Sequence, residues 1–146
     1  MKDKLILLGW IVGLLSLISV LLILTQSALA FNLLRTANNI FISNDDPRRA
    51  SSYLHTKTGK AEIFGYWYLM YNSTDRMFVF TVFHDGILVP LCAIVASDFT
   101  VSEVLPLSAH ATQIFDAIPK SVLQMYVNKI ENAAYINFKT RRGTAR

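Results

Sequence analysis

The hydrophobic pattern of the chain begins with one uninterrupted apolar run from Leu5 to Leu24. The run is mostly Leu, Ile and Val, and it carries no charged residue. A helix of about twenty residues rises about 30 Å, which is the thickness of the hydrocarbon core of a bilayer. We therefore expect residues 1–25 to form a transmembrane anchor that contacts lipid through Leu5, Trp10, Leu14, Leu21 and Leu24.

The same segment has a second interpretation, a secretory signal peptide. Residues 27–30 (Ser-Ala-Leu-Ala) place small side chains at both positions that a signal peptidase reads, so cleavage after Ala30 would secrete the remainder. The apolar part of a signal peptide is usually about 7–15 residues long, which is shorter than this run and favours a retained signal anchor. Lys2 and Lys4 precede the run, and only Arg35 lies close after it. This bias predicts a cytoplasmic N-terminus and a domain on the exported (periplasmic or extracellular) side.

Helical periodicity continues beyond the anchor. Apolar residues such as Phe31, Leu34 and Phe41 recur at helical spacing, with polar residues between them, so we expect residues 26–42 to extend the helix. Turn-forming residues and Pro47 follow, which predicts that the helix ends there and that residues 43–60 form a linker loop.

Residues 61–138 have the pattern of a compact α+β domain. Strand-like segments cover 62–71, 77–83, 87–96 and 99–105, and Asp85-Gly86 between two of them is a strong hairpin signal. Pro90 inside the third segment suggests an edge position or a bulge. A helical stripe runs from about Ser108 to Ile130 with a break at Pro119, and residues 134–138 form a candidate last strand. The predicted fold class is α+β: an N-terminal transmembrane helix with a helical extension, then an antiparallel meander of three to five strands packed with one or two C-terminal helices.

A second membrane span over residues 77–96 is the rival interpretation of the central strands. The segment is long enough, but His84 and Asp85 fall near its middle. A central Asp costs about 2.5–3.5 kcal/mol on membrane-insertion scales, so the hairpin interpretation is favoured.

Both faces of the predicted sheet are apolar, whereas an antiparallel sheet with one solvated face normally alternates apolar and polar residues. The C-terminal helices can cover one face. The other requires the 26–42 helix, another subunit or lipid headgroups. The pattern therefore indicates assembly with other protein subunits, as a homo- or hetero-oligomer, through a candidate partner face of Phe64, Tyr66, Trp67, Tyr68 and Phe80.

Charge changes this picture only at the C-terminus. The net charge is +4, and the last eight residues, 139–146, contain four basic residues and no acid. We expect a solvated basic tail, with contact to anionic lipid or an acidic partner as the functional alternative, through Lys139, Arg141, Arg142 and Arg146. Elsewhere acids and bases balance, so no nucleic-acid surface is expected.

The residues that usually carry chemistry are sparse. Cys92 is the one cysteine, which excludes an internal disulfide, and His55, His84 and His110 lack the spacing of a helical metal site. Asp45-Asp46 before Pro47 fits a turn better than a calcium site. Nucleophile-elbow, phosphate-loop and dinucleotide-binding motifs are absent from the sequence. We therefore expect a non-enzyme with no catalytic residue, no metal site and no cofactor.

A long N-terminal helix followed by an antiparallel sheet resembles the outline of type IV pilin-like subunits. Pilins carry a charged leader that ends in Gly and an apolar stretch with Glu at its fifth position. Here Gly9 is followed by Trp10, and no acid lies within Leu5–Leu24, so the pilin function is not carried over. The leading functional hypothesis is a single-pass, non-catalytic accessory or scaffolding subunit of a membrane assembly. The alternative is a membrane-tethered sensor domain that binds a small ligand in a pocket against the aromatic strand predicted over residues 62–71.

Overall fold

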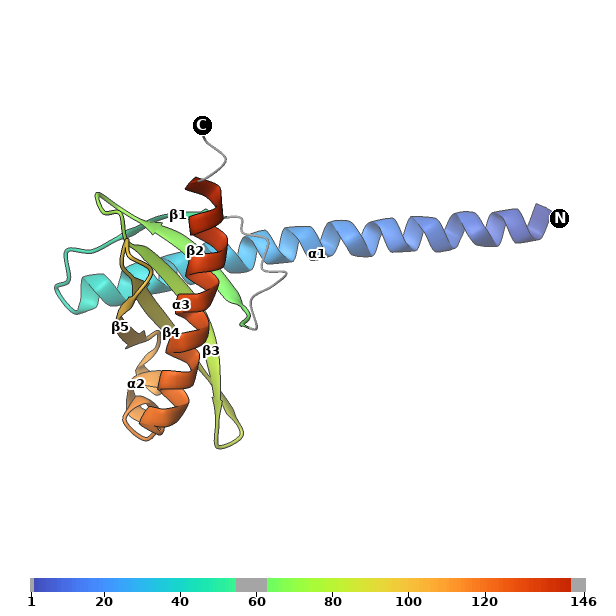
Figure 1. The fold of residues 1–146 in the computed structure, drawn as a ribbon. Helices are drawn as coiled ribbons and strands as arrows, with labels where there is room; N and C mark the ends of the chain where they lie inside the picture. The colour runs from blue at the N-terminus through green and yellow to red at the C-terminus, as the bar shows by residue number, and fades with distance from the viewer. Residues whose placement is uncertain (1, 55–62, 143–146) are drawn as a thin grey trace. The chain divides into compact units, whose positions relative to one another are not determined.

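The computed structural model describes residues 2–54 and 63–142, with side chains for residues 9–26, 28–54 and 63–139. The chain forms two compact units, Met1–Asn32 and Leu33–Arg146. The elements follow in the order α1 (Lys2–Ser43), β1 (Ala50–Leu54), β2 (Gly65–Met70), β3 (Arg76–His84), β4 (Ile87–Val95), β5 (Val101–Pro106), α2 (Ala109–Phe115) and α3 (Lys120–Arg142) (Figure 1). The predicted α+β class is confirmed.

The first unit is the apolar part of α1. The helix is long and apolar enough to cross a membrane, a property that a signal sequence would share. The hydroxyls of Ser16 and Ser19 donate to the carbonyls of Val12 and Leu15, at 2.9 and 2.8 Å. These bonds satisfy the polar groups of the run within the helix itself, as a hydrocarbon environment requires.

The predicted helical extension is also confirmed, because α1 continues without a break to Ser43. Its end has a local cause. Asp45 adopts a left-handed backbone (φ 53°), and the Asp46 N–H donates back to the Phe41 carbonyl at 2.8 Å. Such a bond caps carbonyls that the last helical turn leaves without partners.

The sheet is an antiparallel meander in which the five strands lie in sequence order, β1-β2-β3-β4-β5. Its centre is the nine-residue pair β3 and β4, joined by Asp85-Gly86. Both turn residues have positive φ, 48° and 80°, as a two-residue hairpin turn with the favoured twist needs. The predicted hairpin is confirmed, and the alternative of a second membrane helix over residues 77–96 is wrong.

Although β4 pairs with β3 on one side and with β5 on the other, Pro90 itself lies where β5 no longer pairs, so the expected edge position is found locally, and the β3–β4 register there shows no bulge. The β4–β5 ladder ends at the pair Leu91–Pro106, so Leu91, the residue after Pro90, is the last residue of β4 that pairs with β5. The Pro90 carbonyl accepts from the Leu107 N–H at 3.0 Å. The missing N–H of this proline therefore falls just past the end of the ladder, where no strand pair needs it.

Each face of the sheet carries its own core. On one face, α2 and α3 pack on the sheet through a cluster that includes Trp67, Phe78, Leu91, Ile130 and Phe138. On the other face, the extension of α1 within the second unit covers a cluster that includes Ala37, Phe41, Tyr68, Met77 and Ile94. We call this second surface the α1 face. The cover that the apolar pattern requires is thus supplied in part by the chain itself.

Two segments differ from their predicted structure. Part of the expected linker 43–60 forms edge strand β1, because the backbone of Ala50 bonds to α1: its N–H donates to Asn38 Oδ1 at 2.8 Å, and its carbonyl accepts from Asn38 Nδ2 at 2.9 Å. The expected strand 134–138 is part of α3 instead, because Ile130, Ala134 and Phe138 form a buried stripe at helical spacing. The backbone of residues 139–142, expected in the tail, also belongs to α3.

Candidate docking surface on the sheet

The α1 face is the surface on which a functional site is best defined. Side chains alternate along a strand, and Met77 and Val79 of β3 lie in the α1-face core with Cys92 and Ile94 of β4. The β3–β4 register is regular from Arg76–Val95 to His84–Ile87. Thr81 and Phe83 of β3, and Leu88 and Pro90 of β4, therefore continue the same face toward the Asp85-Gly86 turn.

The helix leaves this end of the face uncovered. Phe83 and Leu88 are paired across the two strands, yet they are 64% and 63% exposed. The pair beside them, Thr81 and Pro90, is also accessible to solvent. Phe64 is 93% exposed and lies two residues before Tyr66, which packs against the α1-face core, so the alternation of side chains assigns Phe64 to the same face. We call these residues the hairpin patch: Phe64, Thr81, Phe83, Leu88 and Pro90.

The hairpin patch contains no charged side chain, although surface strands normally alternate apolar with polar residues. The lengths of the elements explain why it is uncovered. A nine-residue strand is about 30 Å long, whereas a helix is only about 10 Å across. One helix crossing β3 and β4 cannot cover both ends of them.

The end of α1 on this face is fixed by an ion-pair network. Arg48 binds Asp46 through Nη2 and Oδ2 at 2.5 Å and reaches Glu103 of β5 at 2.8 Å. Its guanidinium also lies 5.6 Å from the centre of the Phe41 ring. The hydrogen bond from Arg48 holds the pKa of the Asp46 carboxyl below its usual value, since it favours the charged form. Helix, loop and edge strand are thereby connected across the face.

The predicted partner face splits between the two sides of the sheet. Trp67 and Phe80 belong to the core under α2 and α3, and Tyr68 is fully buried in the α1-face core. Tyr66 is half-buried with Tyr53, their ring centres 5.8 Å apart. Only Phe64 of the five is exposed for most of its surface. The aromatic run at 64–68 therefore builds mainly the domain's own core.

The aromatic side chains expected to line a ligand pocket pack against one another. The Trp67 ring lies 4.5 Å from the ring of Phe78 and 5.1 Å from that of Phe138. Burial raises the pKa of the Tyr68 hydroxyl, which has no exposed surface. These contacts describe a filled core at the position where the alternative hypothesis places a small molecule.

The predicted basic contacts lie at the end of α3. Lys139 Nζ donates to the Tyr135 hydroxyl at 2.5 Å and lies 4.3 Å from the centre of that ring. Arg141 and Arg142 continue the helical backbone, while Arg146 lies outside the described residues. Both contacts of Lys139 are therefore local to α3.

Within the described part of the chain, the histidines and the cysteine do not form a common site. His84 lies beside Asp85 at the hairpin turn, with Nε2 3.5 Å from Oδ2, and His110 is exposed on α2; His55 lies outside the described residues. Cys92 is buried, and burial raises the pKa of its thiol to about 12. Among the described residues, no group of three or more His, Cys, Asp or Glu side chains could hold a metal ion.

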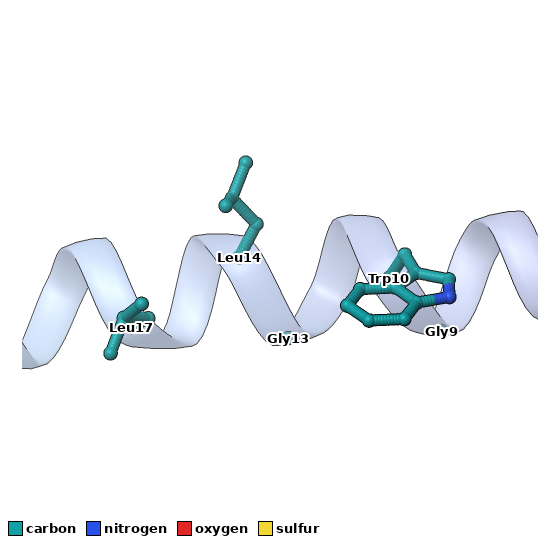
Figure 2. A pocket seen from close by; sticks show the side chains of 5 residues that line it. All are labelled: Gly9, Trp10, Gly13, Leu14 and Leu17. Carbon is teal, nitrogen blue, oxygen red and sulfur yellow. The ribbon is translucent and has the colours of Figure 1, made fainter.

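The predicted anchor residues Trp10, Leu14, Leu21 and Leu24 are exposed along α1, while Leu5 is described only as helical backbone. A surface pocket on α1 is lined by Gly9, Trp10, Gly13, Leu14 and Leu17, whose positions along the helix are labelled in Figure 2. A Cβ at either glycine would have nothing within 4 Å. Glycines four residues apart in an apolar helix form a packing motif that the sequence contains but that was not among the predicted sites.

No protein-family model matches this chain, and no curated protein or solved structure is significantly similar to it. The surface and the chemistry of the molecule itself are therefore the basis for inferring its function.

Proposed function

We propose that the chain is a single-pass, membrane-anchored, non-catalytic scaffolding subunit that assembles through the hairpin patch. The observation that carries this proposal is the uncharged, exposed end of the α1 face, where Phe83 and Leu88 lie side by side in solvent. Exposed apolar surface of this kind on a small domain is typical of protein interaction sites.

Two further observations support a structural role. The apolar helix of the first unit has the length and hydropathy of a membrane span, and its serine hydroxyls are bonded within the helix. The reactive and charged groups also fit a structural role, because Cys92 is buried and Arg48 links the loop after α1 to strand β5. Retention of the anchor, with the domain on the exported side, completes the proposal; cleavage after Ala30 is the alternative.

The proposal is tested by isolating the tagged full-length chain from native membranes in mild detergent. Mass spectrometry of the purified chain distinguishes an intact N-terminus from one that begins at Phe31. Native electrophoresis and crosslinking then measure its assembly. We expect an intact chain in a complex larger than a monomer.

Matched variants connect that assembly to the patch. Leu88→Asp places a carboxylate in the patch, and Met125→Asp makes the same kind of change on the exposed surface of α3, a helix that packs on the opposite face of the sheet. We expect Leu88→Asp to dissociate the complex, because a carboxylate buried without a partner is strongly unfavourable, and Met125→Asp to retain it. A wild-type chain that is monomeric in native membranes would contradict the proposal.

A further inference from the structure

The hairpin patch has a composition that allows it to face a copy of itself. In a two-fold interface the same surface meets itself, so any charge at its centre would be opposed by an identical charge. Thr81, Phe83, Leu88 and Pro90 carry none. The nearest ionisable side chains in the hairpin, His84 and Asp85, are at its turn, where they would form a polar rim.

The exposed apolar area of the patch approaches the apolar part of a standard dimer interface. An aromatic side chain buries about 150–250 Å² when fully covered, and leucine somewhat less, so the exposed fractions of Phe64, Phe83 and Leu88 amount to about 400 Å² of apolar surface. Each partner in a standard interface buries about 800 Å², of which about 56–65% is apolar. Three side chains therefore supply most of the apolar surface required from one partner.

From the uncharged composition and the area together, we infer that the occupant of the hairpin patch is a second copy of this chain. The inference rests on the proposed function, since anchoring in one membrane gives all copies the same orientation. It also raises their effective concentration, so a patch of this modest size suffices. A two-fold axis perpendicular to the membrane then brings two β3–β4 hairpins together, α1 face against α1 face.

A cysteine at the centre of the patch tests this arrangement directly. Thr81→Cys in the full-length chain places a thiol on an exposed position of the α1 face, and Ser97→Cys places one in the exposed β4–β5 turn at the other end of β4. The wild-type chain supplies the baseline, because Cys92 is buried. Membranes are treated with copper phenanthroline and analysed by non-reducing electrophoresis.

We expect Thr81→Cys to form a disulfide-linked dimer about tenfold faster than Ser97→Cys. Adding Leu88→Asp to Thr81→Cys should lower that rate by about tenfold, since two carboxylates would be buried against one another, whereas adding Met125→Asp should leave it unchanged. Equal rates for Thr81→Cys and Ser97→Cys, or a rate insensitive to Leu88→Asp, would overturn the inference.

The same variants separate this inference from the proposed function. A native complex that Leu88→Asp dissociates, without a disulfide between Thr81→Cys chains, would show that the patch binds another protein and would overturn the second copy alone. A monomeric chain with no such disulfide would overturn both.

Discussion

The reciprocal hydrogen bonds between Asn38 and Ala50 lead to a measurable prediction about how the helix is held on the sheet. Asn38 Nδ2 donates to the Ala50 carbonyl at 2.9 Å, and Asn38 Oδ1 accepts from the Ala50 N–H at 2.8 Å. Ala50 is a buried residue of edge strand β1. Asn38→Ala removes both partners and leaves two backbone groups without bonds in a place that water reaches poorly.

The magnitude follows from these two bonds. Each hydrogen bond contributes about 0.5–1.5 kcal/mol net, and a group left buried without a partner costs about 1–3 kcal/mol. The better helix propensity of Ala offsets about 0.5 kcal/mol. We therefore expect Asn38→Ala to lower the free energy of unfolding by about 2–4 kcal/mol. With a slope of about 2 kcal/mol per molar urea, the midpoint should fall by about 1–2 M.

The adjacent residue provides a matched control. Asn39 is exposed on the same turn of α1, so Asn39→Ala should change stability by no more than about 0.5 kcal/mol. Unfolding is followed by the fluorescence of buried Trp67 in full-length protein in detergent, with Trp10→Phe in every variant to remove the second tryptophan. Equal urea midpoints for Asn38→Ala and Asn39→Ala would refute the role assigned to these bonds.

Two further predictions concern the strand interior and the loop after α1. Gly65→Ala should destabilise the domain by about 1–3 kcal/mol, because a Cβ there would collide with the Val79 carbonyl and the Phe78 ring. Gly13→Ala is the control, since a Cβ at Gly13 has nothing within 4 Å. Equal thermal unfolding midpoints for the two variants would contradict the prediction. The pKa of Asp46 is lowered by Arg48, so its contribution to stability is present above the unfolded pKa of about 3.9 and lost as the pH falls through the folded pKa. Asp46→Asn should therefore lower the urea midpoint at pH 7 and flatten its decline below about pH 4, and a decline as steep as that of the wild type would contradict this assignment.

Local signals predicted the hairpin and helix boundaries well. Asp85-Gly86 specifies its turn through two residues that tolerate positive φ, and the break at Pro119 separates α2 from α3. Strand β1 has no such signal. Ser51 and Ser52 are exposed and polar, and the strand is held by pairing with β2 and by Asn38, a residue twelve positions away from Ala50. The local pattern of apolar and polar residues does not predict long-range contacts of this kind.

The segment 134–138 shows the opposite error. Tyr135, Ile136 and Phe138 favour strands by propensity, yet they lie in α3. Ala133 and Ala134 are both buried, and their small size allows the helix backbone to approach the sheet closely. Tertiary packing overrides the local preference here, as it often does for short segments.

The candidate docking surface could be predicted only in part. The alternation in β3 predicts that Phe83 and Val79 share a face, and that the sheet has two apolar sides. Which of these residues is covered depends on the path of the helix over the face. That path is fixed by Asn38 and the Arg48 network, whose partners lie far apart in sequence.

The extension of α1 has a consequence for how the domain is made and handled. Ala37 and Phe41 are synthesised before any strand, but the β4 residues that share their core, Cys92 and Ile94, are made some fifty residues later. During synthesis, the apolar side chains of this part of α1 therefore lack their packing partners until β4 has been made. A truncated version intended for soluble expression should keep Leu33–Ser43. A chain that begins after the end of α1 at Ser43 would lack the helix that covers one face of the sheet.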